Sequence, residues 1–114
     1  MNISFVFRHM ESSEVIKEHV KDKLEKIKKY LIHGVEAHVV LSVEKFRQQC
    51  EIHISERDFS AQALEVSDDL YTSIDLVVHK LEKQLKKHKK IVKDHKIKEA
   101  REIRDSKVFL GMGD

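Results

Sequence analysis

The spacing of hydrophobic residues constrains the fold of this chain more than any other feature, because its period changes along the sequence. In the first segment, Ile3, Phe5 and Phe7 fall on one face and Ser4 and Val6 on the other. Side chains of a strand point alternately to opposite faces, so such a pattern predicts a strand with one covered face. The segments that alternate in this way are residues 2–7, 35–43, 50–55 and 59–63.

Two other segments repeat every three or four residues, which is the spacing of one face of an α-helix. The first helix is predicted at residues 13–32. Ser12 or Ser13 can cap its start, and Gly34 stands where a left-handed residue would end it. Its hydrophobic face consists of Ile16, Val20, Leu24, Ile27 and Leu31.

The second helix is predicted to start at residues 67–69, Ser-Asp-Asp, which offer a cap and negative charge at the positive end of the helix dipole. Its periodicity fades after about Val92. The core-facing positions are Leu70, Ile74, Val77, Val78, Leu81 and Leu85.

The element order is therefore β-α-β-β-β-α, which predicts an α+β fold. The strand-helix-strand opening favours a right-handed crossover that makes the first strand parallel to its neighbour. Strands with one polar face require both helices on the same side, so we expect a two-layer sandwich with a four-stranded mixed sheet. The 114 residues suit one domain. We assign residues 1–95 to it and residues 96–114 to a charged C-terminal tail.

Composition argues against several classes of protein. Cys50 is the only cysteine, so neither a disulfide framework nor a cysteine-rich zinc site is expected. Because Cys50 alternates with Ile52 and Ile54, it is predicted to be a small buried hydrophobic residue. No apolar run is long enough to span a membrane and no signal peptide is recognisable, so the expected location is cytoplasmic.

Motifs for catalysis are also missing from the sequence. It contains no glycine-rich phosphate loop, no nucleophile elbow and no His-Glu-x-x-His. His88 and His95 could share a helix face, but their spacing of seven is not that of a metal site. We expect a protein that is not an enzyme and that uses no metal, cofactor or small-molecule substrate.

The net charge of the chain is small, but its positive charge is concentrated in one segment. The net charge is +2, yet residues 80–98 contain nine lysines against Glu82 and Asp94. With about 100° of rotation per residue, four of these lysines form a stripe that points away from the core. These are Lys80, Lys83, Lys87 and Lys90, and Lys86 and His79 broaden the stripe. On the first helix, a second row steps by three through Lys23, Lys26 and Lys29.

Lysine is a flexible point charge that suits phosphate groups, so the two rows predict contact with a nucleic-acid backbone. Base stacking would need exposed aromatic residues on the sheet, whereas Phe5, Phe7 and Phe59 belong to inward-facing sets. Shape-based contact with structured RNA fits better. A lysine-rich helix face can also be simply solvated. An amphipathic membrane-surface helix is a further alternative, but its apolar face is committed to the core.

Two stretches resemble the ribosome hibernation promoting factor and ribosome-associated inhibitor family, whose members were once labelled sigma-54 modulation proteins. Residues 68–75, DDLYTSID, are similar to an acidic-Leu-Tyr-x-x-Ile-Asp signature, and residues 80–89, KLEKQLKKHK, to the basic helix that follows it. Residues 38–42, HVVLS, resemble the second strand of the family. The resemblance covers residues 2 to about 95 and implies a fold like a double-stranded-RNA-binding domain with an added strand.

The resemblance also implies a function. Members bind the small ribosomal subunit between head and body, where they overlap the mRNA path and the A- and P-site tRNA positions, under stress or in stationary phase. The residues that contact ribosomal RNA in the family correspond to Lys23, Lys26, Lys29, Lys80, Lys83 and Lys87, and helical geometry adds Lys86 and Lys90. We therefore expect a translation inhibitor with the small subunit and its rRNA as partners.

Two questions stay open from the sequence. The alternative function is a protein-interaction module that modulates a sigma factor, as the older family label suggests. In addition, residues 96–114 match neither of the short family types, one ending soon after the second helix and the other carrying an acidic tail. The sequence therefore does not decide whether the protein promotes or blocks ribosome dimers.

Overall fold

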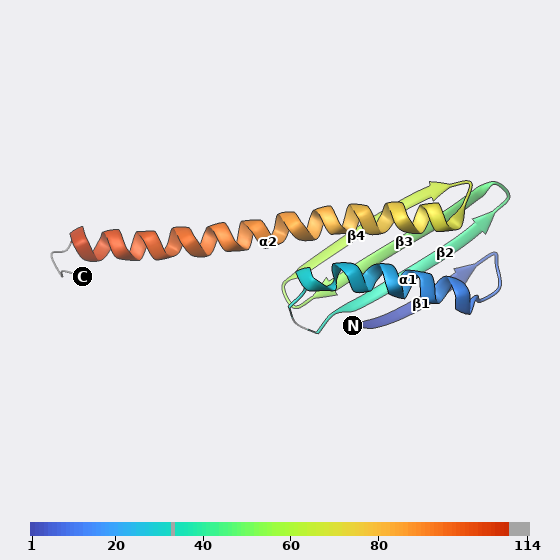
Figure 1. Cartoon of the computed structure of the whole chain (residues 1–114), viewed down its shortest axis with the longest axis horizontal. Helices are drawn as coiled ribbons and strands as arrows, with labels where there is room; N and C mark the ends of the chain where they lie inside the picture. Colours follow the sequence, from blue (N-terminus) through green and yellow to red (C-terminus); the bar gives the residue numbers. More distant parts are fainter. Residues whose placement is uncertain (33, 110–114) are drawn as a thin grey trace.

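The computed structural model describes residues 1–32 and 34–109, with side chains described up to Lys89. The sheet has four strands in the order β1-β2-β3-β4 (Figure 1). Strand β1 pairs in parallel with β2, and the other two pairs are antiparallel. The strands span β1 Asn2–Arg8, β2 Glu36–Glu44, β3 Arg47–Glu56 and β4 Phe59–Ser67. The predicted α+β class and the mixed four-stranded sheet are confirmed.

Both helices cover one face of this sheet, as predicted (Figure 1). Helix α1, Glu14–Ile27, connects the parallel strands β1 and β2, and helix α2, Leu70–Phe109, follows β4. The core between the layers combines the inward-facing residues of the strands with the apolar faces of the helices. Its largest fully buried side chains include Leu24, Leu41, Ile52, Ile74 and Leu81.

Cys50 belongs to this core, as the alternation predicted, and is fully buried. Burial raises the pKa of its thiol to about 12, and the neighbouring Glu51 carboxylate contributes to the rise. The thiolate is the reactive form of cysteine, so Cys50 fills space and is chemically inert at neutral pH.

The N-terminus of α1 agrees with the sequence, since the Ile16 amide donates a hydrogen bond of 3.2 Å to the Ser13 hydroxyl. Its C-terminus does not. The helix stops at Ile27, and a 3-10 turn, η1 (Lys28–Tyr30), follows in place of the continuation predicted to residue 32. Gly34 does not adopt the left-handed conformation that was expected of it. Instead, the Glu56 carboxylate accepts a hydrogen bond of 3.1 Å from the Ile32 amide, so a tertiary contact fixes the chain after η1.

Helix α2 is fixed to the sheet at its first turn. The side-chain oxygen of Gln48 on β3 accepts a hydrogen bond of 2.9 Å from the Leu70 amide. The hydroxyl of Ser73 donates to the Gln48 carbonyl oxygen at 2.7 Å. From there α2 runs for 40 residues, about 60 Å at 1.5 Å per residue, and leaves the sheet behind (Figure 1). It therefore continues well past Val92, through most of the segment predicted as a tail. Among the described residues, no helix combines the length and apolarity needed to cross a bilayer.

Candidate nucleic-acid interface

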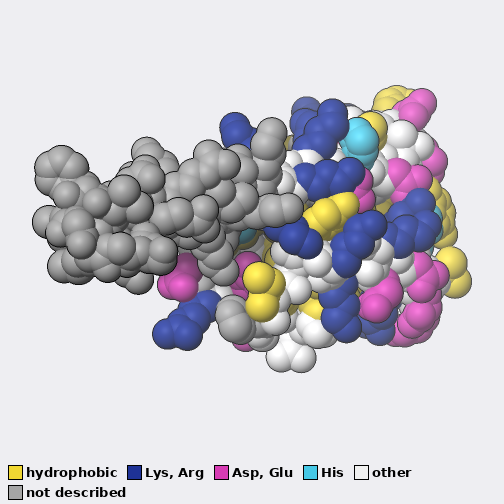
Figure 2. Space-filling model, turned by 60° about the vertical axis from the view of Figure 1, so that its left-hand side comes forward, with side chains coloured by type: hydrophobic (Ala, Val, Ile, Leu, Met, Phe, Trp, Pro, Cys, Tyr) yellow, Lys and Arg dark blue, Asp and Glu magenta, His cyan; other side chains and the backbone are white. Residues whose placement is uncertain are grey.

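Helices α1 and α2 lie side by side, and Asp75 of α2 joins them. Its carboxylate contacts His19 of α1 at 3.1 Å and the ammonium of Lys23 at 3.5 Å. One turn earlier on α2, the ring of Tyr71 packs edge-on against His19, with 4.9 Å between the ring centroids. These contacts hold the two helices against each other. Figure 2 shows Lys and Arg side chains gathered in the middle of the visible face.

The two lysine rows meet at Tyr30, the last residue of η1. The ammonium groups of Lys29, Lys86 and Lys89 lie 5.3, 5.9 and 5.8 Å from the centre of its ring. A cation within about 6 Å of an aromatic centroid is attracted by the ring quadrupole. We call Tyr30 with these three lysines the Tyr30 cluster. It joins η1 to α2 and gathers positive charge from both.

Lys86 is held in place by its neighbours, and they also favour its charged form. Its ammonium lies 3.2 Å from the Glu82 carboxylate one turn earlier. The hydrogen bond and the charge of Glu82, followed by the influence of Tyr30, raise the pKa of Lys86 above its ordinary value. The side chain is exposed, but a phosphate would have to compete with the Glu82 carboxylate for it.

Lys83 and Lys87 lie on the outer surface of α2, and Lys26 lies on the outer surface of α1. All three are exposed. Within the part of the chain that has described side chains, none of them makes an ion pair. Their charges are therefore not neutralised by the body of the protein.

Two other predicted lysines, like Lys86, are paired with carboxylates. Lys80 turns toward the edge of the sheet and forms an ion pair with Glu65 of β4. Lys23 shares the Asp75 carboxylate with His19. A phosphate would have to compete with these carboxylates. The eighth predicted residue, Lys90, lies outside the described side chains, although its backbone is part of α2.

The sequence prediction missed Tyr30 and Lys89. Lys89 was part of the lysine-rich segment, but it falls at the side of the stripe that faces η1. Tyr30 carried no signal, because its role depends on a turn that brings it against α2. A tyrosine next to a lysine at the end of a predicted helix was the only available indication.

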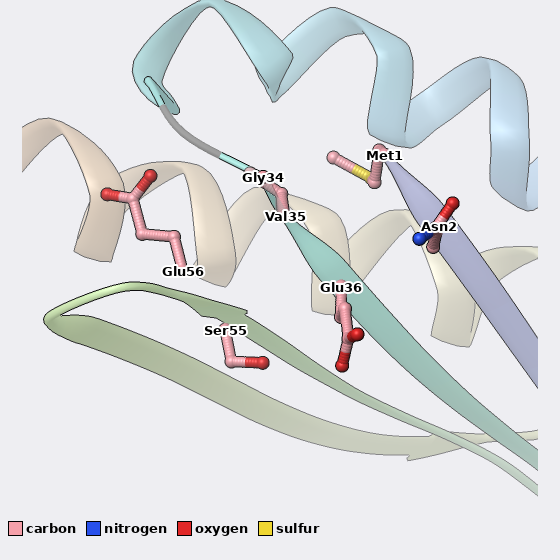
Figure 3. A pocket seen from close by; sticks show the side chains of 7 residues that line it. All are labelled: Met1, Asn2, Gly34, Val35, Glu36, Ser55 and Glu56. Atoms are coloured by element: carbon pink, nitrogen blue, oxygen red, sulfur yellow. The ribbon is translucent and has the colours of Figure 1, made fainter.

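The surface of the described part of the chain has hollows. One of about 390 Å³ lies where β1, β2 and the end of β3 meet, and Met1, Asn2, Gly34, Val35, Glu36, Ser55 and Glu56 line it (Figure 3). The carboxyl groups of Glu36 and Glu56 point apart in this view rather than toward a common centre. Among the residues that the structure describes, no group of three or more His, Cys, Asp or Glu side chains could hold a metal ion.

Most of the chain is similar to known proteins. The model of the family described as "Sigma 54 modulation protein / S30EA ribosomal protein" matches residues 3–93. The ribosome hibernation promoting factor of Escherichia coli K12 is 31% identical over 97 residues, which cover 83% of this chain and 100% of that protein.

Two further relatives extend the comparison. The ribosome hibernation promotion factor of Bacillus subtilis is 30% identical over 92 residues, which cover 78% of this chain and 49% of that protein, so this chain matches about half of it. The crystal structure of the N-terminal domain of Thermus thermophilus Protein Y is 30% identical with a TM-score of 0.71, and the match covers 77% of this chain and 99% of that one.

Proposed function

The chain belongs to the sigma 54 modulation protein / S30EA ribosomal protein family, and we propose from this membership that it is a cytoplasmic ribosome hibernation factor. Its partner would be the small ribosomal subunit, and its contacts would be with ribosomal RNA. The bound protein would occupy the decoding channel and keep mRNA and tRNA out. The names of the matched relatives do not favour the alternative of a sigma-factor modulator.

The observation that carries the proposal is the junction of two lysine rows at Tyr30. A lysine row on one helix is commonly a solvated face, and its acids usually balance it. Here Lys83, Lys87 and Lys26 have no acidic partner among the described side chains. Two elements from distant parts of the chain supply cations to the same face, which matches the extended charge of an RNA backbone.

The mechanism would be steric and would need no turnover. Lysine ammonium groups replace the counterions of the phosphates, so affinity comes largely from released ions and falls steeply as salt is added. The layered core fixes the spacing of the two helices before binding, which limits the conformational entropy lost on association. Removal of the protein would return the subunit to translation unchanged.

The proposal is tested by reversing charge on the outer surface of α2. The double variant Lys83→Glu, Lys87→Glu should fail to co-sediment with purified small subunits at low salt while its melting temperature stays near that of the wild type. Both side chains are exposed, so the core is untouched.

A matched control keeps the change in net charge and moves it elsewhere. Lys21 and Lys28 line a hollow with Met1, Asn2 and Ile3 on the flank of α1 that faces away from α2. The variant Lys21→Glu, Lys28→Glu should still bind. Equal binding by the two double variants would show that the proposed surface is wrong. Binding that survives ribonuclease treatment would instead support a protein partner.

A further inference from the structure

We propose that the tip of the β2–β3 hairpin, formed by Lys45, Phe46 and Arg47, is a second RNA contact, in which Phe46 stacks on an unpaired base. Lys45 and Arg47 would hold the neighbouring phosphates. The inference rests on the proposed function, because it takes ribosomal RNA as the partner. It adds a contact of a different kind, since the lysines of the helices contact the backbone alone.

Phe46 is conspicuous for its exposure. Its side chain is 88% exposed, the highest value among the large hydrophobic residues that the structure describes. The other phenylalanines with described side chains behave differently, because Phe5, Phe7 and Phe59 pack against the core. The ring of Phe46 thus contributes little to the core and is available for a contact outside the protein.

The requirements of the turn do not explain this residue either. Glu44 pairs with Arg47, so Lys45 and Phe46 form a two-residue turn, and Lys45 adopts a φ of 51°. A positive φ at the first position of a two-residue turn favours Gly, because it strains a residue that has a side chain, and it sets no requirement for Phe at the second position. Strands β2 and β3 are paired with each other up to the turn, so the backbone that carries Phe46 is held in place.

The surroundings of Phe46 are positive. Lys45 and Arg47 flank it in sequence and line a hollow of about 570 Å³ with Phe46, Val43, Glu44 and His9. Glu44 is the acid next to the tip, and its carboxylate lies 2.9 Å from the imidazole of His9. Lys45 and Arg47 form no ion pair with the described side chains, so their charge is available to a polyanion.

An exposed aromatic ring between two cations matches the chemistry of a nucleotide. The ring offers a stacking surface for any base, and the cations offer contacts for the phosphates on either side of it. A site for a protein partner would be expected to have apolar residues, and not two cations, around the ring. The tip lies at the end of the sheet opposite to η1, so it would contact a different stretch of RNA from the Tyr30 cluster (Figure 1).

The test compares three substitutions of Phe46 in the full chain, with binding to purified small subunits measured over a range of salt concentrations. Phe46→Ala should weaken binding by roughly 5- to 100-fold, as for the loss of one stacked base. Phe46→Trp should restore it. Phe46→Leu should behave like Phe46→Ala, because it keeps apolar area but has no aromatic face. Ile32→Ala, a truncation of a side chain that is 78% exposed, is the control and should bind as the wild type does.

The dependence on salt separates stacking from charge. Phe46→Ala should leave the slope of log K against log salt unchanged, because no phosphate contact is lost. Lys45→Ala with Arg47→Ala should reduce that slope by about 1.4 to 1.8. The chain has no tryptophan, so the fluorescence of Phe46→Trp reports on the tip alone and should be quenched by an unstructured oligoribonucleotide.

Two outcomes would overturn the inference and leave the proposed function standing. In the first, Phe46→Ala binds as tightly as the wild type while Lys83→Glu, Lys87→Glu does not bind. In the second, Phe46→Leu retains full affinity, which indicates an apolar protein contact in place of stacking. Loss of binding in Phe46→Ala alone, with the α2 double variant unaffected, would support the hairpin contact and contradict the proposed helix surface.

Discussion

The hydroxyl of Ser73 shows how one polar group can be buried without cost in this core. Ser73 is fully buried, and it is the polar residue among the described buried ones. It donates to the Gln48 carbonyl oxygen at 2.7 Å and lies 2.6 Å from the hydroxyl of Ser67. With the bond from Leu70 to the Gln48 side chain, it fixes the first turn of α2 to β3.

Replacing Ser73 with Ala should lower the free energy of unfolding by about 1–3 kcal/mol, because the partly buried Gln48 carbonyl oxygen would lose the hydroxyl donor. For a domain of this size, each 1 kcal/mol corresponds to a fall of about 4–8 °C in melting temperature. Thermal denaturation followed by circular dichroism measures it. Ser60→Ala, at an exposed position of β4, is the control and should change little. Equal melting temperatures for the two variants would mean that the Ser73 hydrogen bonds do not contribute.

At the scale of elements, the two flanks of α2 differ in what they face. One flank meets α1 and η1, where Asp75 and Lys86 make their contacts. The other meets β4, where the Gln84 side chain donates to the Gln62 carbonyl oxygen at 2.9 Å and Lys80 pairs with Glu65. The outward surface between the flanks carries Lys83 and Lys87. The unpaired lysines of α2 therefore occupy a narrower strip of the helix surface than the lysine-rich sequence suggests.

The Tyr30 cluster can be tested through its ring. Tyr30→Ala should weaken binding to small subunits about two- to fivefold, because the ring that positions Lys29, Lys86 and Lys89 would be lost and each such exposed attraction is worth about 0.5–1 kcal/mol. Tyr30→Phe keeps the ring and should bind nearly as well as the wild type. Sedimentation at fixed salt gives the affinities. If Tyr30→Phe were as weak as Tyr30→Ala, the hydroxyl and not the ring face would be the important group.

Local patterns were enough to predict most elements of the fold. Alternation located the strands, and the Ser13 cap and the spacing of Val20, Leu24 and Ile27 located α1. The end of α1 could not be predicted, because the Glu56 carboxylate, 24 residues beyond Ile32, fixes the chain there. No local pattern contains such a contact.

Only part of the candidate interface could be predicted, because the rest also depends on contacts between residues that are distant in sequence. A rotation of 100° per residue puts Lys83 and Lys87 on the outside of α2 without knowledge of its neighbours. The pairing of Lys80 with Glu65 and the approach of Lys86 and Lys89 to Tyr30 depend on which element lies beside each flank. That information comes only from the assembled layers. The predicted RNA contacts of these residues are still a prediction.

For the whole molecule, the body and the far part of α2 contribute differently to the fold. Among the side chains of α2 that the structure describes, the last buried core residue is Leu85, and His88 stacks on Phe59 with 3.7 Å between the ring centroids. Beyond this point α2 leaves the sheet (Figure 1). The core residues that the structure describes therefore all precede residue 95.

A chain truncated after residue 95 should accordingly melt within a few degrees of the full chain and should keep its affinity for small subunits. Differential scanning calorimetry and sedimentation provide the two measurements. The comparison tests the predicted division into residues 1–95 and 96–114. A large loss of stability would show that the segment after residue 95 belongs to the folding unit. A loss of binding alone would place part of the interface on it.

The single parallel pairing in the sheet also sets the order in which strands can assemble during synthesis. Turns of two residues separate β2 from β3 and β3 from β4, so each finds its partner as soon as it is made. In β1, Asn2 pairs with Glu36, and the whole of α1 lies between them. Strand β1 precedes its partner β2 in the chain. It therefore stays unpaired, with Ile3, Phe5 and Phe7 uncovered, until β2 has been synthesised.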